Sequence, residues 1–192
     1  MGPSGCGYAF RNSRNTLFTK ENIRKIYVSS LVNSTYKAGI EHTVYNSLIR
    51  ILSGYRGIVL VSEPSDADAI LTGSVNAATY TGSASSSVAG LNPVDLANQL
   101  NLESRSFAIS TEYMATLSCS FYLSRPKPLY FGQPTGLWSA GFSRTQPFPA
   151  ANQLDVPGAT SALINESEFD RTLSDLSRKM VDDVSESMLA MF

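Results

Sequence analysis

The sequence predicts an α+β fold, with two helices packed on one face of a mostly antiparallel sheet of four or five strands. In this α/β sandwich a long hairpin is central. Three observations predict it: helical periodicity early in the chain, helical periodicity at its end, and a two-residue alternation throughout residues 107–123. Because amphipathic helices and one-sided strands must each bury an apolar face, layering both helices on one sheet satisfies every element.

The first elements are a strand over residues 24–32 and a helix over residues 36–53. The strand segment alternates between two faces, and the helix segment repeats apolar residues at spacings of three and four. Thr35 is the expected N-cap of this helix, and Gly54 stands where a left-handed residue commonly follows a helix.

Two further strands are predicted over residues 57–62 and 67–80. The following stretch, 81–106, begins with small polar residues of the kind found in loops. Within it, residues 92–100 favour one or two helical turns, because Pro93 occupies a first helical position. This stretch therefore predicts an insertion before the long hairpin.

The hairpin spans residues 107–144, with a turn at Ser-Arg-Pro-Lys-Pro and a returning strand interrupted by glycine and proline. Cys119 lies on the apolar side of its first strand, which predicts a small core residue. A loop is expected over 144–161. A terminal amphipathic helix follows, with Asn165 and Glu168 resembling a capping box. Its apolar stripe recurs at spacings of three and four: Phe169, Leu173, Leu176, Met180, Val184, Met188 and Met191.

Composition excludes several classes of protein. The chain has 192 residues with 15 Lys+Arg against 16 Asp+Glu, so no net charge draws it to nucleic acid. Two cysteines rule out a disulfide framework and a cysteine zinc site. No apolar run approaches the roughly 18 residues that a membrane helix needs. A signal peptide is not visible, and an engineered start at Met1-Gly2 would hide one.

The sequence contains no constellation of catalytic residues. His42, the only histidine, belongs to the first predicted helix and is interpreted as structural. No nucleophile elbow or Cys–His signature accompanies it. The pair Asp66 and Asp68 is interpreted as a solvated strand end rather than an acid/base pair. We therefore expect neither an enzyme nor a cofactor or metal.

Cys6 follows Ser4 and Gly5 and precedes a glycine, which is the pattern at the end of a bacterial lipobox. Lipidation would explain a cysteine at a terminus, since two or three acyl chains hold a domain on a membrane at about 0.8 kcal/mol per buried CH₂. Pro3 departs from the leucine usual at that position. We predict a lipidated leader over residues 1–20 and one domain over 21–192.

The chain contains, in this order, GCGYAF (5–10), the segment 26–52, ADAILTGSV (67–75), TEYMATLSCSFYL, GLWSAGFSR and a C-terminal helix ending in MLAMF. This order resembles the LptE family of lipopolysaccharide-assembly lipoproteins. GCGYAF (5–10) is similar to the mature N-terminus of the family. Residues 26–52 resemble its first strand, Asn-Ser-Thr turn and helix, and ADAILTGSV (67–75) resembles its second strand. TEYMATLSCSFYL and GLWSAGFSR resemble its long hairpin, and the helix ending in MLAMF completes the order.

The resemblance implies a protein without catalytic activity at the periplasmic face of the outer membrane, anchored by lipid at Cys6. It would plug the LptD β-barrel translocon, help that barrel to assemble, and contact lipopolysaccharide. In the family, basic residues lie before the hairpin and before the last helix; Arg105 and Arg144 occupy those regions here, and Arg125 and Lys127 occupy the hairpin turn. Phosphate groups of lipopolysaccharide would be their ligands.

Two other functions remain open at this stage. A periplasmic lipoprotein of the CsgG or cell-wall-synthase-activator kind would share the terminal lipid and the first strands, but it would have further helices between its later strands. A small-ligand-binding or enzymatic domain would have a pocket with converging polar groups. Formation of a complex with an outer-membrane barrel would separate the LptE-like function from both.

Overall fold

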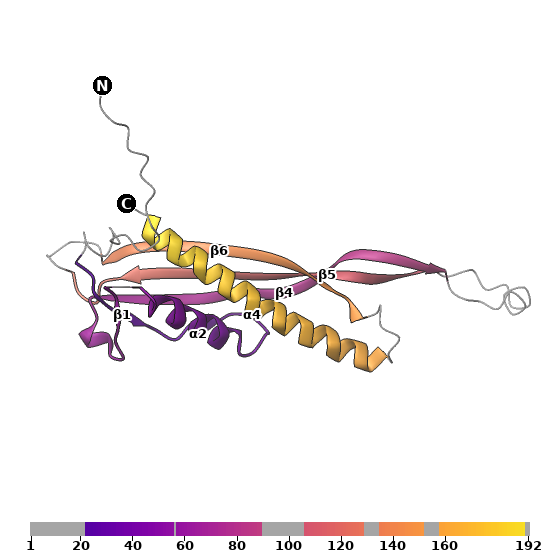
Figure 1. Ribbon diagram of the computed structural model, residues 1–192, viewed down its shortest axis with the longest axis horizontal. Coiled ribbons are helices and arrows are strands. Elements are labelled where there is room, and N and C mark those ends of the chain that lie inside the picture. The colour runs from indigo at the N-terminus through magenta and orange to yellow at the C-terminus, as the bar shows by residue number, and fades with distance from the viewer. Residues whose placement is uncertain (1–21, 56, 90–105, 129–134, 152–157, 191–192) are drawn as a thin grey trace, which may run out of the picture.

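The computed structural model describes residues 22–55, 57–89, 106–128, 135–151 and 158–190. Across these ranges the chain forms an elongated body with one six-stranded sheet and two helices, α2 and α4 (Figure 1). The predicted α+β class and its two helices are confirmed. The sheet is mixed, with strand order β3-β1-β4-β5-β6 and β2 paired to β4.

The first half of the sheet is parallel, which the sequence analysis did not predict. β1 (Lys25–Val28) lies between β3 (Val59–Leu60) and β4 (Ala69–Ala89) and runs parallel to both. β2 (Val32–Asn33) pairs with the same edge of β4, also in parallel. Alternation reveals a strand but not the direction of its neighbour. Parallel strands need a crossover connection, and α2, between β2 and β3, provides it.

The second half of the sheet is antiparallel. β5 (Ser106–Ser124) pairs with β4 along nearly its whole length, and with β6 (Gly136–Pro149) only as far as Glu112. Residues 129–134, between β5 and β6, lie outside the described ranges, so the hairpin predicted there stays a prediction.

β4 continues to Ala89, although the sequence predicted a loop from residue 81. A segment of serines and alanines has the composition of a loop, but the hydrogen bonds that pair it with β5 need only backbone groups. Beyond the last β5–β6 pair, residues 84–89 and 106–110 form a two-stranded ribbon that projects from the body (Figure 1). The helical turns predicted over 92–100 lie outside the described ranges.

α2 (Ile40–Leu52) is shorter than predicted. Its N-cap is Gly39, whose φ of +85° is readily adopted by glycine. The prediction of Thr35 as the cap was therefore wrong. Gly54 is not left-handed either, since among the described glycines only Gly39 and Gly57 have positive φ. A one-turn 3-10 helix, η1 (Pro64–Asp66), leads into β4.

α4 (Gly158–Ala190) begins one to two turns before the predicted capping box. Asn165 therefore lies inside the helix, where its Oδ1 accepts a hydrogen bond of 2.7 Å from the backbone N–H of Ala151. The predicted loop over 144–161 was too long, because β6 continues to Pro149.

Both helices pack on the same face of the sheet, and one apolar core lies between the layers. β5 contributes the alternate residues that the sequence marked as apolar, including Cys119, which is 1% exposed. The predicted stripe of α4 is buried as far as it is described: Phe169, Leu173, Leu176, Met180, Val184 and Met188. The helices thus cover one face of the sheet.

Candidate functional site

The other face of β4, β5 and β6 has no helix over it in the described part of the chain. Its residues alternate with the core residues, and most bear hydroxyl groups. We call this surface the hydroxyl face: Thr72, Ser74, Asn76, Thr79, Thr81, Thr116, Ser118, Ser120, Tyr122, Ser139, Ser143 and Thr145. Rows such as Thr79–Thr116–Thr145 and Thr72–Tyr122–Ser139 cross all three strands.

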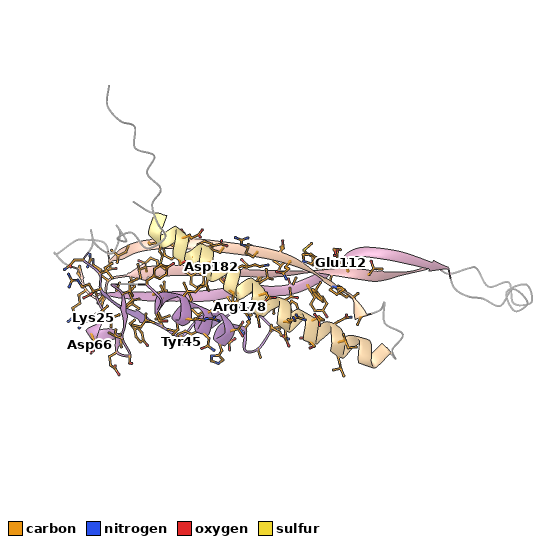
Figure 2. The ribbon with its side chains drawn as sticks, in the orientation of Figure 1. Lys25, Tyr45, Asp66, Glu112, Arg178 and Asp182 are labelled. Carbon is orange, nitrogen blue, oxygen red and sulfur yellow. The ribbon has the colours of Figure 1, made fainter. Side chains whose placement is uncertain are left out.

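The hydroxyl face is polar without charge. Ser74 donates to Asn76 Oδ1 at 2.9 Å, and Asn76 Nδ2 donates to Ser120 Oγ at 2.7 Å. The first charged residue beyond it on β5 is Glu112, labelled in Figure 2 near the base of the ribbon, which accepts a hydrogen bond from Ser83. Such a surface can exchange hydrogen bonds with another polar surface, but it does not attract phosphate through charge.

Two of the predicted basic residues lie just beyond β5. Arg125 is buried at 9% exposure, and its backbone N–H donates to the carbonyl oxygen of Thr135 at 2.8 Å. Lys127, two residues later, is exposed. Of the pair, therefore, Lys127 has the more accessible charge.

Arg125 belongs to a charged group around Asp68. The Asp68 carboxylate accepts hydrogen bonds from the backbone N–H groups of Arg24 (2.9 Å) and Lys25 (2.8 Å). Burial of Asp68 raises its pKa, but these two bonds, together with the charges of Lys25 and Arg125, outweigh burial and hold the pKa below its usual value. Asp68 therefore joins the start of β1 to the start of β4, a structural role.

Arg144 lies on β6, on the side of the sheet that the helices cover. Its Nε and Nη2 donate to the two carboxylate oxygens of Asp183 on α4, at 2.6 and 2.5 Å. The hydrogen bonds to Asp183 and its charge hold the pKa of the guanidinium above its usual value. The ion pair is only partly exposed, and it joins the edge strand to the helix.

The predicted basic residues do not form one cluster. Arg144 is opposite Leu117, which places it eight residues before Arg125 along the sheet, about 26 Å away at 3.3 Å per residue. Cys6 and Arg105 lie outside the described ranges, so their predicted roles stay predictions.

Sequence reasoning missed one charged group. Lys37, in the turn before α2, forms an ion pair with Asp170 at 2.5 Å and a second with Glu166, both on α4. The contact joins Lys37 to Glu166, which is 129 positions away in the sequence, so no local pattern could have indicated it. A hollow of about 250 Å³ lies beside it, lined also by Gly39, Thr43 and Leu173.

The described residues hold no group of three or more histidine, cysteine or acidic side chains that could bind a metal. None of the helices in this part of the chain is long and apolar enough to span a membrane. Arg178 and Asp182, labelled on α4 in Figure 2, line a second hollow with Ser47 and Ile51 of α2.

Comparison with known proteins gives one family. The family model described as "LptE: Lipopolysaccharide-assembly" matches residues 23–188, which include every described strand and nearly all of α4. No curated protein matches the chain.

Several solved structures are similar to this chain at low identity. The PelC dodecamer from Paraburkholderia phytofirmans is 16% identical, with a TM-score of 0.46 over 88% of this chain and 89% of that chain. Rare lipoprotein B from Shewanella oneidensis is 13% identical, with a TM-score of 0.42 over 86% and 93%. Lipoprotein GNA1162 from Neisseria meningitidis is 11% identical, with a TM-score of 0.42 over 78% and 97%.

Proposed function

The chain belongs to the LptE family of lipopolysaccharide assembly, and from this premise we propose that it plugs and helps assemble an LptD-type β-barrel in the outer membrane. The observation that carries the proposal is the pairing of this family match with a sheet that leaves one long polar face uncovered. The role is structural, without catalysis.

The hydroxyl face supports a position inside a barrel. The interior of an outer-membrane barrel is polar, and a plug must present a surface that exchanges hydrogen bonds without burying unpaired charge. The twelve residues of the hydroxyl face meet that requirement, because none of them is Asp, Glu, Lys, Arg or His. Tyr122, 43% exposed, adds one aromatic ring to it.

The ribbon supports the same role. β4 and β5 reach past β6 as a pair whose outer edges lack a third strand within the described ranges. Paired strands can project into a lumen because their backbone groups are already partly satisfied by each other. In the proposed complex the ribbon lies along the barrel axis, beyond the part of the sheet that the helices cover.

The lipid anchor and the lipopolysaccharide contacts belong to the same proposal. Cys6 carries the acyl groups that hold the chain at the periplasmic face of the outer membrane. Lys127, Arg125, Arg144 and Arg105 are the proposed contacts for lipopolysaccharide phosphates. Lys127 is the most available of the three described ones, because it is exposed and outside any strand.

Co-purification from outer membranes tests the proposal. The tagged full-length chain should bring down a stoichiometric, heat-modifiable barrel with bound lipopolysaccharide. Cys6→Ser should abolish palmitate labelling and leave the barrel contact intact once the chain reaches the periplasm. Recovery of the chain without any barrel would refute the plug, and palmitate label on the Cys6→Ser variant would refute the anchor.

A charge variant tests the lipopolysaccharide contacts. Lys127→Ala combined with Arg105→Ala should lower the lipopolysaccharide recovered per barrel, with Lys179→Ala on α4 as the matched control. Lys179 is a suitable control because its Nζ already donates to Gln146 at 2.6 Å. Equal recovery from both variants would reassign the two residues to ordinary surface.

A further inference from the structure

The turn between β2 and α2 presents one side chain entirely to solvent. Tyr36 has 110% of its reference accessible area, more than any other exposed large apolar residue recorded in the described part of the chain. An aromatic ring of this size usually buries much of its surface in the fold. Tyr36 therefore contributes almost nothing to the packing of this domain.

The turn that carries Tyr36 is held in one conformation. Asn33 Oδ1 accepts hydrogen bonds from the backbone N–H of Thr35 (2.8 Å) and from its hydroxyl (2.7 Å). Asn33 Nδ2 donates to the Lys37 carbonyl oxygen at 2.9 Å and to Glu41 Oε2 at 2.7 Å. These bonds tie the residues on both sides of Tyr36, so the exposed ring stands on a pre-ordered backbone.

A second set of contacts fastens the turn to α4. Besides its ion pairs with Asp170 and Glu166, Lys37 Nζ lies 5.5 Å from the centroid of the Phe169 ring. Burial lowers the pKa of Lys37, but the bonds to Asp170 and Glu166 outweigh it and keep the ammonium charged. Lys37, the residue next to Tyr36, is thus joined to α4 through two half-exposed carboxylates and the buried ring of Phe169.

Two further exposed apolar side chains are close in sequence to the residues that join the turn to α4. Val32, four residues before Tyr36, is 62% exposed. Leu163, 73% exposed, lies one helical turn before Glu166, on the same side of α4. Three of the six exposed large apolar residues recorded in the described ranges, Val32, Tyr36 and Leu163, therefore lie within five residues of Lys37 or Glu166 in the chain.

The charged groups that hold this turn are mostly acidic. Glu41 accepts a hydrogen bond from Asn33, and Glu166 and Asp170 form ion pairs with Lys37, so three carboxylates accompany one ammonium. An acidic border repels phosphate groups and anionic bilayers, and it complements a surface rimmed by lysine or arginine.

We propose that Tyr36 is the anchor by which this chain docks into a pocket with a basic rim on its protein partner. The proposal rests on the proposed function, which makes that partner the barrel. Aromatic anchors seated in pockets contribute most of the binding free energy at many interfaces. A turn already ordered by Asn33 and Lys37 loses little further freedom on binding.

Competition inside cells tests the anchor. The wild-type chain and a variant, each with its own tag, are expressed together, and the ratio bound to the purified barrel is measured. Tyr36→Ala should be recovered about 30-fold less than the wild type, and Tyr36→Phe should compete nearly equally. Val59→Ala, which trims a 58% exposed apolar side chain on the edge strand β3 outside the hydroxyl face, is the control and should lose less than threefold.

A second variant separates the ring from its support. Asn33→Ala keeps Tyr36 but frees the turn, and should reduce recovery about tenfold while the unfolding midpoint of the isolated chain stays above the assay temperature. Binding of Tyr36→Ala to lipopolysaccharide vesicles should equal that of the wild type, because the border is acidic.

The outcomes are distinct. Equal recovery of Tyr36→Ala and wild type on the barrel refutes the anchor and leaves the plug intact. A loss of vesicle binding with unchanged barrel binding also refutes it, because the partner is then the lipid. Failure of the wild type itself to bind a barrel refutes both proposals.

Discussion

The two faces of β4, β5 and β6 are built from alternate residues of the same strands, yet they have opposite chemistry. On one face Leu117, Cys119 and Phe121 are at most 2% exposed under the helices. On the other, Thr116, Ser118 and Ser120 form part of the hydroxyl face. The difference teaches that one face of this sheet determines the fold and leaves the other free to be selected for contact.

The two faces should therefore respond differently to substitution. A residue under the helices excludes water and fills volume, so its loss leaves a cavity. A residue on the hydroxyl face exchanges one hydrogen-bonding partner for water and changes folding little.

Thiol reactivity should show the largest contrast. Burial raises the pKa of Cys119 to about 12, so at pH 8 its thiolate is about a thousandfold scarcer than that of a free cysteine with a pKa near 8.5. In a Cys6→Ser background, native Cys119 should label with a maleimide at least about a thousandfold more slowly than a cysteine introduced by Ser120→Cys. Labelling is followed by intact mass at pH 8.

The same burial sets the sign of a pH effect. Since the folded pKa of Cys119 is above that of the unfolded thiol, its contribution to stability is complete below about pH 9 and declines as the pH rises toward 12. Labelling of Cys119 at the rate of the introduced cysteine, without denaturant, would show that the helices do not cover this strand.

Core truncation should give the next largest effect. Leu117→Ala removes a side chain with 0% exposure and should lower the free energy of unfolding by about 2–5 kcal/mol. Thr116→Ala, one residue earlier on the hydroxyl face, should change it by less than about 0.5 kcal/mol. Urea denaturation of both variants measures the difference, and equal losses would mean that the two faces are not distinct.

The sequence predicted what depends on local periodicity. Alternation along β5 identified its buried residues, including Cys119, and the spacing in α4 identified the stripe from Phe169 to Met188, because each pattern repeats within a few residues. The composition of residues 81–89 predicted a loop, which was wrong, because serine and alanine can form a strand when the backbone hydrogen bonds of a long neighbouring strand, here β5, are available. Strand direction was also missed, because alternation is the same in parallel and antiparallel sheets.

The candidate sites depend on contacts that local sequence patterns do not indicate. Lys127 was expected to be an accessible cation and is exposed, but nothing near Arg144 in the sequence indicates its partner on α4. The exposure of Tyr36 could not be read from its neighbours, because the expected cap at Thr35 placed it at the start of the helix. The partner of Arg144 and the exposure of Tyr36 both depend on contacts between segments far apart in the sequence, which a single sequence does not indicate.

Loss of the ion pair between Arg144 and Asp183 should have the smallest effect on stability. This pair lies on the covered side of the sheet, but it is partly exposed, unlike Leu117 and Cys119. The pair is half exposed, so water and salt screen it, and Arg144→Gln or Asp183→Asn should shift the unfolding midpoint less than Leu117→Ala does.

Binding to lipopolysaccharide should be more sensitive to these two substitutions than stability is. Asp183→Asn releases the guanidinium and should strengthen attachment to lipopolysaccharide vesicles, whereas Arg144→Gln should weaken it. Vesicle sedimentation at two salt concentrations measures both variants. If neither one moves the bound fraction, Arg144 serves only to hold the edge strand to α4, and the proposed phosphate contacts shift to Lys127 and its end of the sheet.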